Sequence, residues 1–110
     1  MPTFGQILSE ARKKAGISQK ELAASIKKEN GEAISPQYLN DIEHDRRNAP
    51  GEFLIERFAK VLGVPTDSLL MAAGLLPEDL RKIAAEKVAA AKYEHVADAV
   101  KLFRSKIKGK

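Results

Sequence analysis

The chain has 110 residues, of which 44% are hydrophobic and 31% are charged, and it carries a formal net charge of +4. This composition is typical of a globular protein, and the length allows one domain or one small domain with an appendage. Because the sequence has no cysteine, it excludes a disulfide scaffold, a thiol nucleophile and a cysteine-ligated metal site.

Apolar residues at helical spacing predict two helices in the first 29 residues. The first spans about residues 3–15, with Thr3 as its N-cap. The second opens with Ser18 and Glu21, which have the spacing of a capping box, and we expect it to end near residue 28 or 29. The inward faces contain Phe4, Ile7, Leu8 and Ala11 in the first helix and Leu22, Ala23 and Ile26 in the second.

Three more helices are predicted before residue 75. Ser35 followed by Pro36 is a favourable N-cap and first helical position, and it opens a third helix over about residues 35–45. The fourth helix spans about residues 52–62 and the fifth about residues 66–73. The five helices together predict one compact all-α domain of residues 1–76.

Residues 77–110 form a different kind of segment. Residues 78–108 contain neither glycine nor proline, and one helical face carries Leu80, Ala84, Val88, Val96, Val100, Phe103 and Ile107. That apolar face is interrupted at Lys92, so we expect one long amphipathic helix or a helical hairpin. We favour a dimerisation segment with a basic tail, and a hairpin that caps its own domain is the alternative. The positive excess lies here, because residues 78–110 hold nine basic and five acidic groups and residues 1–77 hold ten of each.

The second and third helices and the connection between them are the most informative part of the sequence. Here the chain resembles the helix-turn-helix domain of the XRE regulators, the family that includes the lambda-type phage repressors and Cro. The matching residues are Ser18-Gln19, Leu22-Ala23, Ser35, Tyr38, Ile42-Glu43, Leu54, Phe58-Ala59, Leu62-Gly63-Val64 and Leu69-Leu70. The resemblance covers about residues 4–74. It implies a lambda-repressor-like domain that binds double-stranded DNA, in a repressor that recognises a pseudo-palindromic operator as a homodimer.

In that family the helix of residues 35–45 would lie in the major groove, and its outward residues are the candidates for reading bases. These candidates are Pro36, Gln37, Asn40 and Asp41. The amides of Gln37 and Asn40 can each form two hydrogen bonds with adenine, whereas Asp41 either accepts from cytosine N4 or repels phosphate. Candidates for phosphate contact are Gln19 at the start of the second helix and Arg46, Arg47 and Asn48 after the third.

Two residues of the motif have a structural interpretation. Glu43 follows Ile42 near the expected core, where an unpaired carboxylate would be costly. The resemblance implies a salt bridge from Glu43 to Arg12, which would orient the first helix against the third. Tyr38 is interpreted as a packing residue rather than as a platform for a base.

The sequence departs from the family pattern at two places. The connection after the second helix is about six residues longer than the usual turn, so either that helix gains a turn or the loop bulges around Asn30-Gly31. Lys27 and Lys28 in this connection are interpreted as solvated charges rather than as DNA contacts. The third helix ends with His44 and Asp45, where a glycine is common.

Enzymatic function has almost no support. The chain has no nucleophile–base pair, no glycine-rich phosphate loop and no HExxH motif, and His95 with Asp98 would supply only two metal ligands. We therefore expect no catalysis, no cofactor and no metal. No apolar run approaches about 18 residues, so we also expect a cytoplasmic protein without a membrane contact.

Two other functions would use the same fold. An antitoxin-type regulator would bind DNA through the same domain and a partner protein through residues 78–110. A protein–protein adaptor would not read DNA, and the zero net charge of residues 1–77 favours it. Against the adaptor, Gln19, Gln37, Asn40, Arg46 and Arg47 would then have no reason to occur together.

Overall fold

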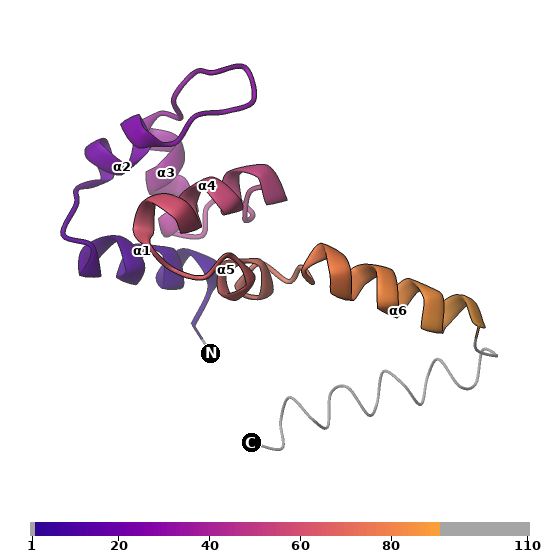
Figure 1. The fold of residues 1–110 in the computed structure, drawn as a ribbon. Helices are drawn as coiled ribbons and strands as arrows, with labels where there is room; N and C mark the ends of the chain where they lie inside the picture. The colour runs from indigo at the N-terminus through magenta and orange to yellow at the C-terminus, as the bar shows by residue number, and fades with distance from the viewer. Residues whose placement is uncertain (1, 91–110) are drawn as a thin grey trace. The chain divides into compact units, whose positions relative to one another are not determined.

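The computed structural model describes residues 2–90 and contains six α-helices and no strand within that range (Figure 1). The helices are α1 (Phe4–Lys14), α2 (Gln19–Ser25), α3 (Pro36–Glu43), α4 (Glu52–Leu62), α5 (Thr66–Ala72) and α6 (Glu78–Ala90). The all-α prediction is confirmed. The chain divides into two units, Met1–Leu76 and Pro77–Lys110. None of the described helices combines the length and the apolar character that crossing a membrane requires.

Beyond Ala90 the predictions for the C-terminal segment lie outside the described residues. They include the continuation of a long helix or hairpin to residue 108, the weak point at Lys92, His95 with Asp98, and the basic tail. Within the described part of that segment, Glu78–Ala90 is helical, as the pattern predicts.

The first three helices begin at side-chain caps. The Oγ atoms of Thr3, Ser18 and Ser35 accept hydrogen bonds from the backbone N–H three residues later, at 3.0–3.1 Å. At the first two caps the third helical residue also returns a bond to the cap backbone, which completes a capping box. The sequence predicted all three starts because each cap depends on residues within one helical turn.

The connection between α2 and α3 corrects one prediction, because α2 ends at Ser25 and not near residue 28 or 29. Ile26 is already extended, and its carbonyl accepts a bond from the Ile34 N–H at 3.0 Å. A single antiparallel bridge pairs Lys27 with Ala33, and Gly31 turns the chain with a φ of 87°. The additional residues therefore form a small hairpin-like loop that stands out between α2 and α3 (Figure 1).

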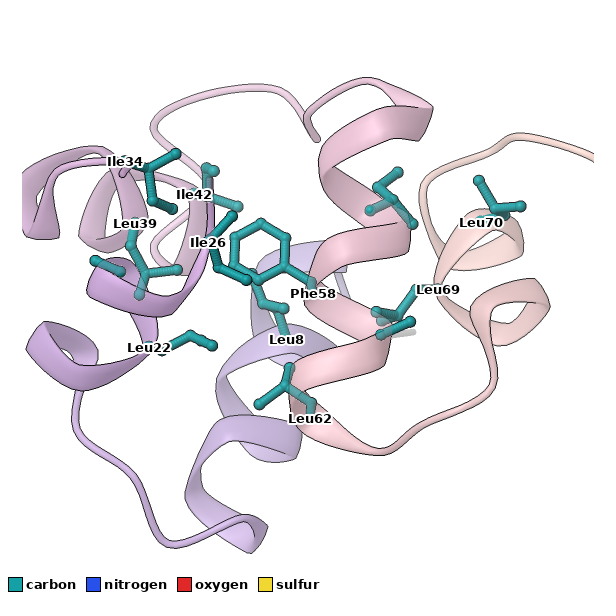
Figure 2. Packing of buried hydrophobic residues seen from close by; sticks show 13 residues of the cluster. Leu8, Leu22, Ile26, Ile34, Leu39, Ile42, Phe58, Leu62, Leu69 and Leu70 are labelled. Atoms are coloured by element: carbon teal, nitrogen blue, oxygen red, sulfur yellow. The ribbon is translucent and has the colours of Figure 1, made fainter. Parts of the chain in front are cut away.

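The hydrophobic core of the first unit lies where α1 to α5 meet. α3 packs against α1 and α2, while α5 packs against α4 and α1. Phe58 of α4 is fully buried and points toward the part of the core built from α1, α2 and α3 (Figure 2). Both ends of the hairpin-like loop are anchored in this core, because Ile26 and Ile34 are buried.

The end of α3 lies against the start of α1. Asp45 follows the helix in the left-handed conformation, with a φ of 59°, where the family pattern has glycine. Its carboxylate accepts bonds from the Thr3 hydroxyl at 2.6 Å and from the Gly5 N–H at 3.2 Å. These bonds offset the strain of the left-handed conformation, which aspartate tolerates better than most residues. α3 itself therefore ends at Glu43, two residues before the predicted end.

Gly5 is the position that permits this close approach, and Gly5→Ala should destabilise the fold by roughly 1–3 kcal/mol. A Cβ atom there would collide with the backbone oxygen of Ile42 and lie 2.7 Å from that of Glu43. Urea denaturation of the two chains measures the loss. Glu10→Ala on the exposed side of α1 is the control and should leave stability nearly unchanged. Equal stability of Gly5→Ala and wild type would contradict the close packing.

Candidate nucleic-acid interface

A buried ion pair connects α1 to α3. Arg12 donates from Nε to Glu43 Oε2 at 2.7 Å and from Nη2 to Glu43 Oε1 at 3.0 Å. The Glu43 side chain is 2% exposed and that of Arg12 is 12% exposed. Arg12 also donates from Nη1 to the carbonyl of Ile17 at 3.0 Å. The ion pair that the resemblance implied is thus present. Through its bond to Ile17, Arg12 also holds the backbone between α1 and α2.

The electrostatic environment of Glu43 favours its ionised form. Burial by itself would raise the pKa of this carboxyl, but the hydrogen bonds from Arg12 and Gln19 outweigh burial, and the net pKa lies below its ordinary value. The same interaction raises the pKa of Arg12. Both partners are therefore charged at neutral pH.

From this ion pair a chain of polar contacts leads to the outward face of α3. Gln19 of α2 donates from Nε2 to Glu43 Oε1 at 2.9 Å, and its Oε1 accepts from Asn40 Nδ2 at 3.2 Å. Gln19 and Asn40 are both half-buried. Two predicted DNA contacts, one from each helix of the motif, are thereby bound to each other and to the structural ion pair.

Asp41 organises the other end of this chain of contacts. Its Oδ1 accepts from Gln37 Nε2 at 2.9 Å and from Arg46 Nε at 3.0 Å. Arg46 Nη2 also donates to Asn40 Oδ1. The pKa of Asp41 is lowered, mainly by the hydrogen bond from Arg46. Gln37, Asn40 and Asp41, which were predicted as separate base contacts, therefore form one connected set with Arg46.

The segment after α3 carries the remaining candidates. The guanidinium of Arg47 lies over the ring of Tyr38, 5.0 Å from its centroid. Tyr38 is half-buried and packs against the core, which agrees with its interpretation as a packing residue. Arg46, Arg47 and Asn48 are exposed and line a hollow of about 490 Å³ whose wall also includes Tyr38 and Asp45. Two guanidinium groups beside an open hollow offer donors of the kind that bind phosphate.

Sequence reasoning missed the role of Asp45, noting only that it stands where glycine is common. Its carboxylate accepts bonds from Thr3 and Gly5, which lie 42 and 40 residues before it in the chain, so no local pattern predicts these bonds. Pro36, the remaining base-reading candidate, lies exposed at the first position of α3 beside the Ser35 cap.

Known proteins resemble this chain over the same region. The family model described as helix-turn-helix matches residues 8–69. A protein of Bacillus subtilis (strain 168), the uncharacterized HTH-type transcriptional regulator RghRB, is 33% identical over 85 residues. That match covers 74% of this chain and 57% of the relative, so the chain spans little more than half of the relative's length.

A solved structure titled as a complex of the SinR protein and the SinI protein is also similar. The match has a TM-score of 0.52 at 21% identity, and it covers 98% of this chain and 100% of the other. At this identity the likeness shows a shared fold.

Removing the charge of Glu43 by Glu43→Gln should cost about 3–5 kcal/mol at neutral pH, because Arg12 stays buried without its counter-charge. The folded pKa of Glu43 is lowered, so its contribution to stability is present above the ordinary value of about 4.5 and is lost as pH falls through the folded pKa. The difference between wild type and variant should therefore shrink in acid.

Urea denaturation at about pH 7 and about pH 3 tests both statements. Glu56→Gln, which changes an exposed carboxylate on α4, is the control and should have little effect at either pH. A Glu43→Gln chain as stable as wild type at neutral pH would show that the ion pair does not hold α1 and α3 together.

Proposed function

Since the chain belongs to the XRE-type helix-turn-helix family of DNA-binding transcription regulators, we propose that it is a sequence-specific repressor. The proposed target is a pseudo-palindromic operator in double-stranded DNA, bound by a homodimer with α3 in the major groove. A repressor of this kind acts on the chromosome, so the proposal includes a cytoplasmic location. It requires neither a cofactor nor a catalytic step.

The observation that carries this proposal is the ordered polar surface of α3. Its apolar side chains Leu39 and Ile42 are buried, while Pro36 and Gln37 are exposed and Asp41 is partly exposed. An α-helix fits the major groove, where amides and charged groups on its outer face meet the base edges. In the adaptor alternative, this surface would have no function for its connected side chains.

Gln37 is the proposed reader of adenine. It is exposed, and among the described residues 2–90 one of its amide hydrogens is engaged, in the bond to Asp41. Its carbonyl oxygen and second hydrogen are the pair that adenine N6 and N7 require. Asn40 is proposed to read a neighbouring base after exchanging its bond to Gln19, while its Oδ1 keeps the bond from Arg46 and accepts a second one from the base. Pro36 and Asp41 border the same surface and restrict which base fits.

Phosphate contacts are proposed on both sides of α3. Gln19 of α2 lies beside Asn40, and Arg47 with Asn48 follows the helix. A phosphate contact fixes the register of the protein on the duplex without selecting a sequence. Arg47 suits this role because it is exposed and its guanidinium is supported by the Tyr38 ring.

The segment from residue 77 is proposed to form the dimer. In α6, Leu80 is 45% exposed and Ile83 is 52% exposed, and they lie one helical turn apart. An apolar pair of this kind favours burial against another chain. The same observation favours the antitoxin-type alternative, in which the segment binds a partner protein instead of a second copy.

Selection of random duplex DNA by the full chain at near-physiological salt should enrich a pseudo-palindrome with half-sites about 10 bp apart. Gln37→Ala should then relax the preference at one base pair of each half-site and weaken binding by about 1–3 kcal/mol. The control is Lys60→Ala on α4, whose consensus should match wild type. A consensus unchanged by Gln37→Ala would contradict the assignment of the base reader. If no sequence is enriched, the adaptor alternative gains support.

A chain that ends at residue 76 should lose affinity for the full operator, because the proposed dimer contact is removed. Its helical circular dichroism and its half-site preference should persist, since the caps and core of α1 to α5 lie within residues 1–76. Sedimentation equilibrium of both chains measures the association. A shortened chain that still sediments as a dimer would refute the dimerisation role of residues 77–110.

A further inference from the structure

We propose that Arg46 reads a guanine base and that Asp41 is the positioning residue that aims it. The inference rests on the proposed function and changes one assignment within it. Sequence position alone grouped Arg46 with Arg47 and Asn48 as phosphate contacts. The geometry separates Arg46 from these neighbours and joins it to the outward face of α3.

The backbone after α3 turns Arg46 back onto the helix. The Asp45 N–H donates to the carbonyl of Ile42 at 3.1 Å, and the Arg46 N–H donates to the carbonyl of Asp41 at 2.8 Å. With Asp45 left-handed, these two bonds form a Schellman motif. Arg46 therefore starts its side chain beside the last turn of α3, which lets the guanidinium reach Asn40 and Asp41.

The contacts use one edge of the guanidinium and leave another open. Nε donates to Asp41 Oδ1 at 3.0 Å, and Nη2 donates to Asn40 Oδ1. These atoms lie on the side edge of the planar group, which has five N–H donors. The far end, where Nη1 and the second hydrogen of Nη2 point the same way, has no contact in these bonds. The side chain is 53% exposed.

Two parallel donors in one plane match the O6 and N7 acceptors of guanine in the major groove. A free arginine loses rotamer entropy when it makes such a contact, but Arg46 is already held on two sides. Its charge is also balanced by Asp41, which weakens attraction to phosphate in general. Arg47 is held differently, because its guanidinium lies over the Tyr38 ring and it acts on Asp41 through its charge, whereas Arg46 also donates a hydrogen bond to Asp41.

The position of Asp41 supports the same interpretation. It accepts bonds from both Gln37 and Arg46 on a single oxygen, so it sets the spacing between the adenine reader and the guanine reader. Asp41 is ionised at neutral pH, and the hydrogen bond from Arg46 lowers its pKa further. We therefore infer a recognition surface in which Gln37 and Arg46 read separate bases and Asp41 holds the two side chains in register.

The test uses the full chain and compares matched Arg→Lys substitutions. Arg46→Lys keeps the charge but removes the planar pair of donors, so the guanine preference at one position per half-site should fall by about 5- to 140-fold. Arg47→Lys is the control and should leave the consensus unchanged. Replacing that guanine by 7-deazaguanine, which lacks N7, should weaken binding of the wild type more than binding of Arg46→Lys.

Asp41→Asn distinguishes positioning from a general structural effect. It should reduce the guanine preference while raising affinity for unrelated duplex DNA, because a negative charge is removed from the interface. Loss of both together would contradict the positioning role. A wild-type consensus that Arg46→Lys leaves unchanged would overturn this inference alone. A wild-type chain that selects no sequence would overturn the proposed function and this inference together.

Discussion

The buried ion pair between Arg12 and Glu43 is the interaction on which the rest of the domain depends. A carboxylate that is 2% exposed would be very costly without a partner, and here both oxygens are bound by one guanidinium. The pair fixes α3 relative to α1, and Gln19 connects α2 to it by donating a hydrogen bond to Glu43 Oε1. Removing one partner of such a pair leaves a buried charge uncompensated, so the arrangement of the three helices is strongly held. In this domain that arrangement determines the orientation of the helix proposed to enter DNA.

The two ends of α3 are held in place by different contacts. Its start depends on the local cap at Ser35 and on the hairpin-like loop, which is held by the bond between Ile26 and Ile34. Its end depends on Asp45, whose bonds to Thr3 and Gly5 attach the exit of the helix to the start of α1. The side chains that follow α3 are thus directed by contacts with the start of α1, which lies outside the helix-turn-helix motif.

The sequence predicted those features that depend on neighbouring residues. The helix starts at Thr3, Ser18 and Ser35 are local features, and the structure has them at the predicted positions, as it has the end of α4 at residue 62. The predicted end of α2 was wrong because Ile26 continues the apolar spacing of the helix but is not helical. Its carbonyl accepts a hydrogen bond from the N–H of Ile34, on the other side of the loop. The connected polar set on α3 could not be predicted, because it depends on the backbone after the helix. The left-handed conformation of Asp45 turns the chain so that the Arg46 side chain lies against Asp41, and no sequence pattern predicts that turn.

The charge distribution bears on the function proposed for this connected set of side chains. Residues 1–77 carry no net charge, so release of counterions contributes less to their affinity for DNA than it would for a strongly basic domain. When the sequence-independent attraction to phosphate is weak, discrimination between operator and other DNA has to come from base contacts. A wrong base leaves the polar groups of these contacts without partners. In the proposed surface Arg46 is already held by Asp41 and Asn40, so less conformational entropy would be lost when it binds a base. With the proposed recognition surface, such a neutral domain would favour selectivity over strength, and the second copy of the proposed homodimer on a repeated half-site would restore the affinity.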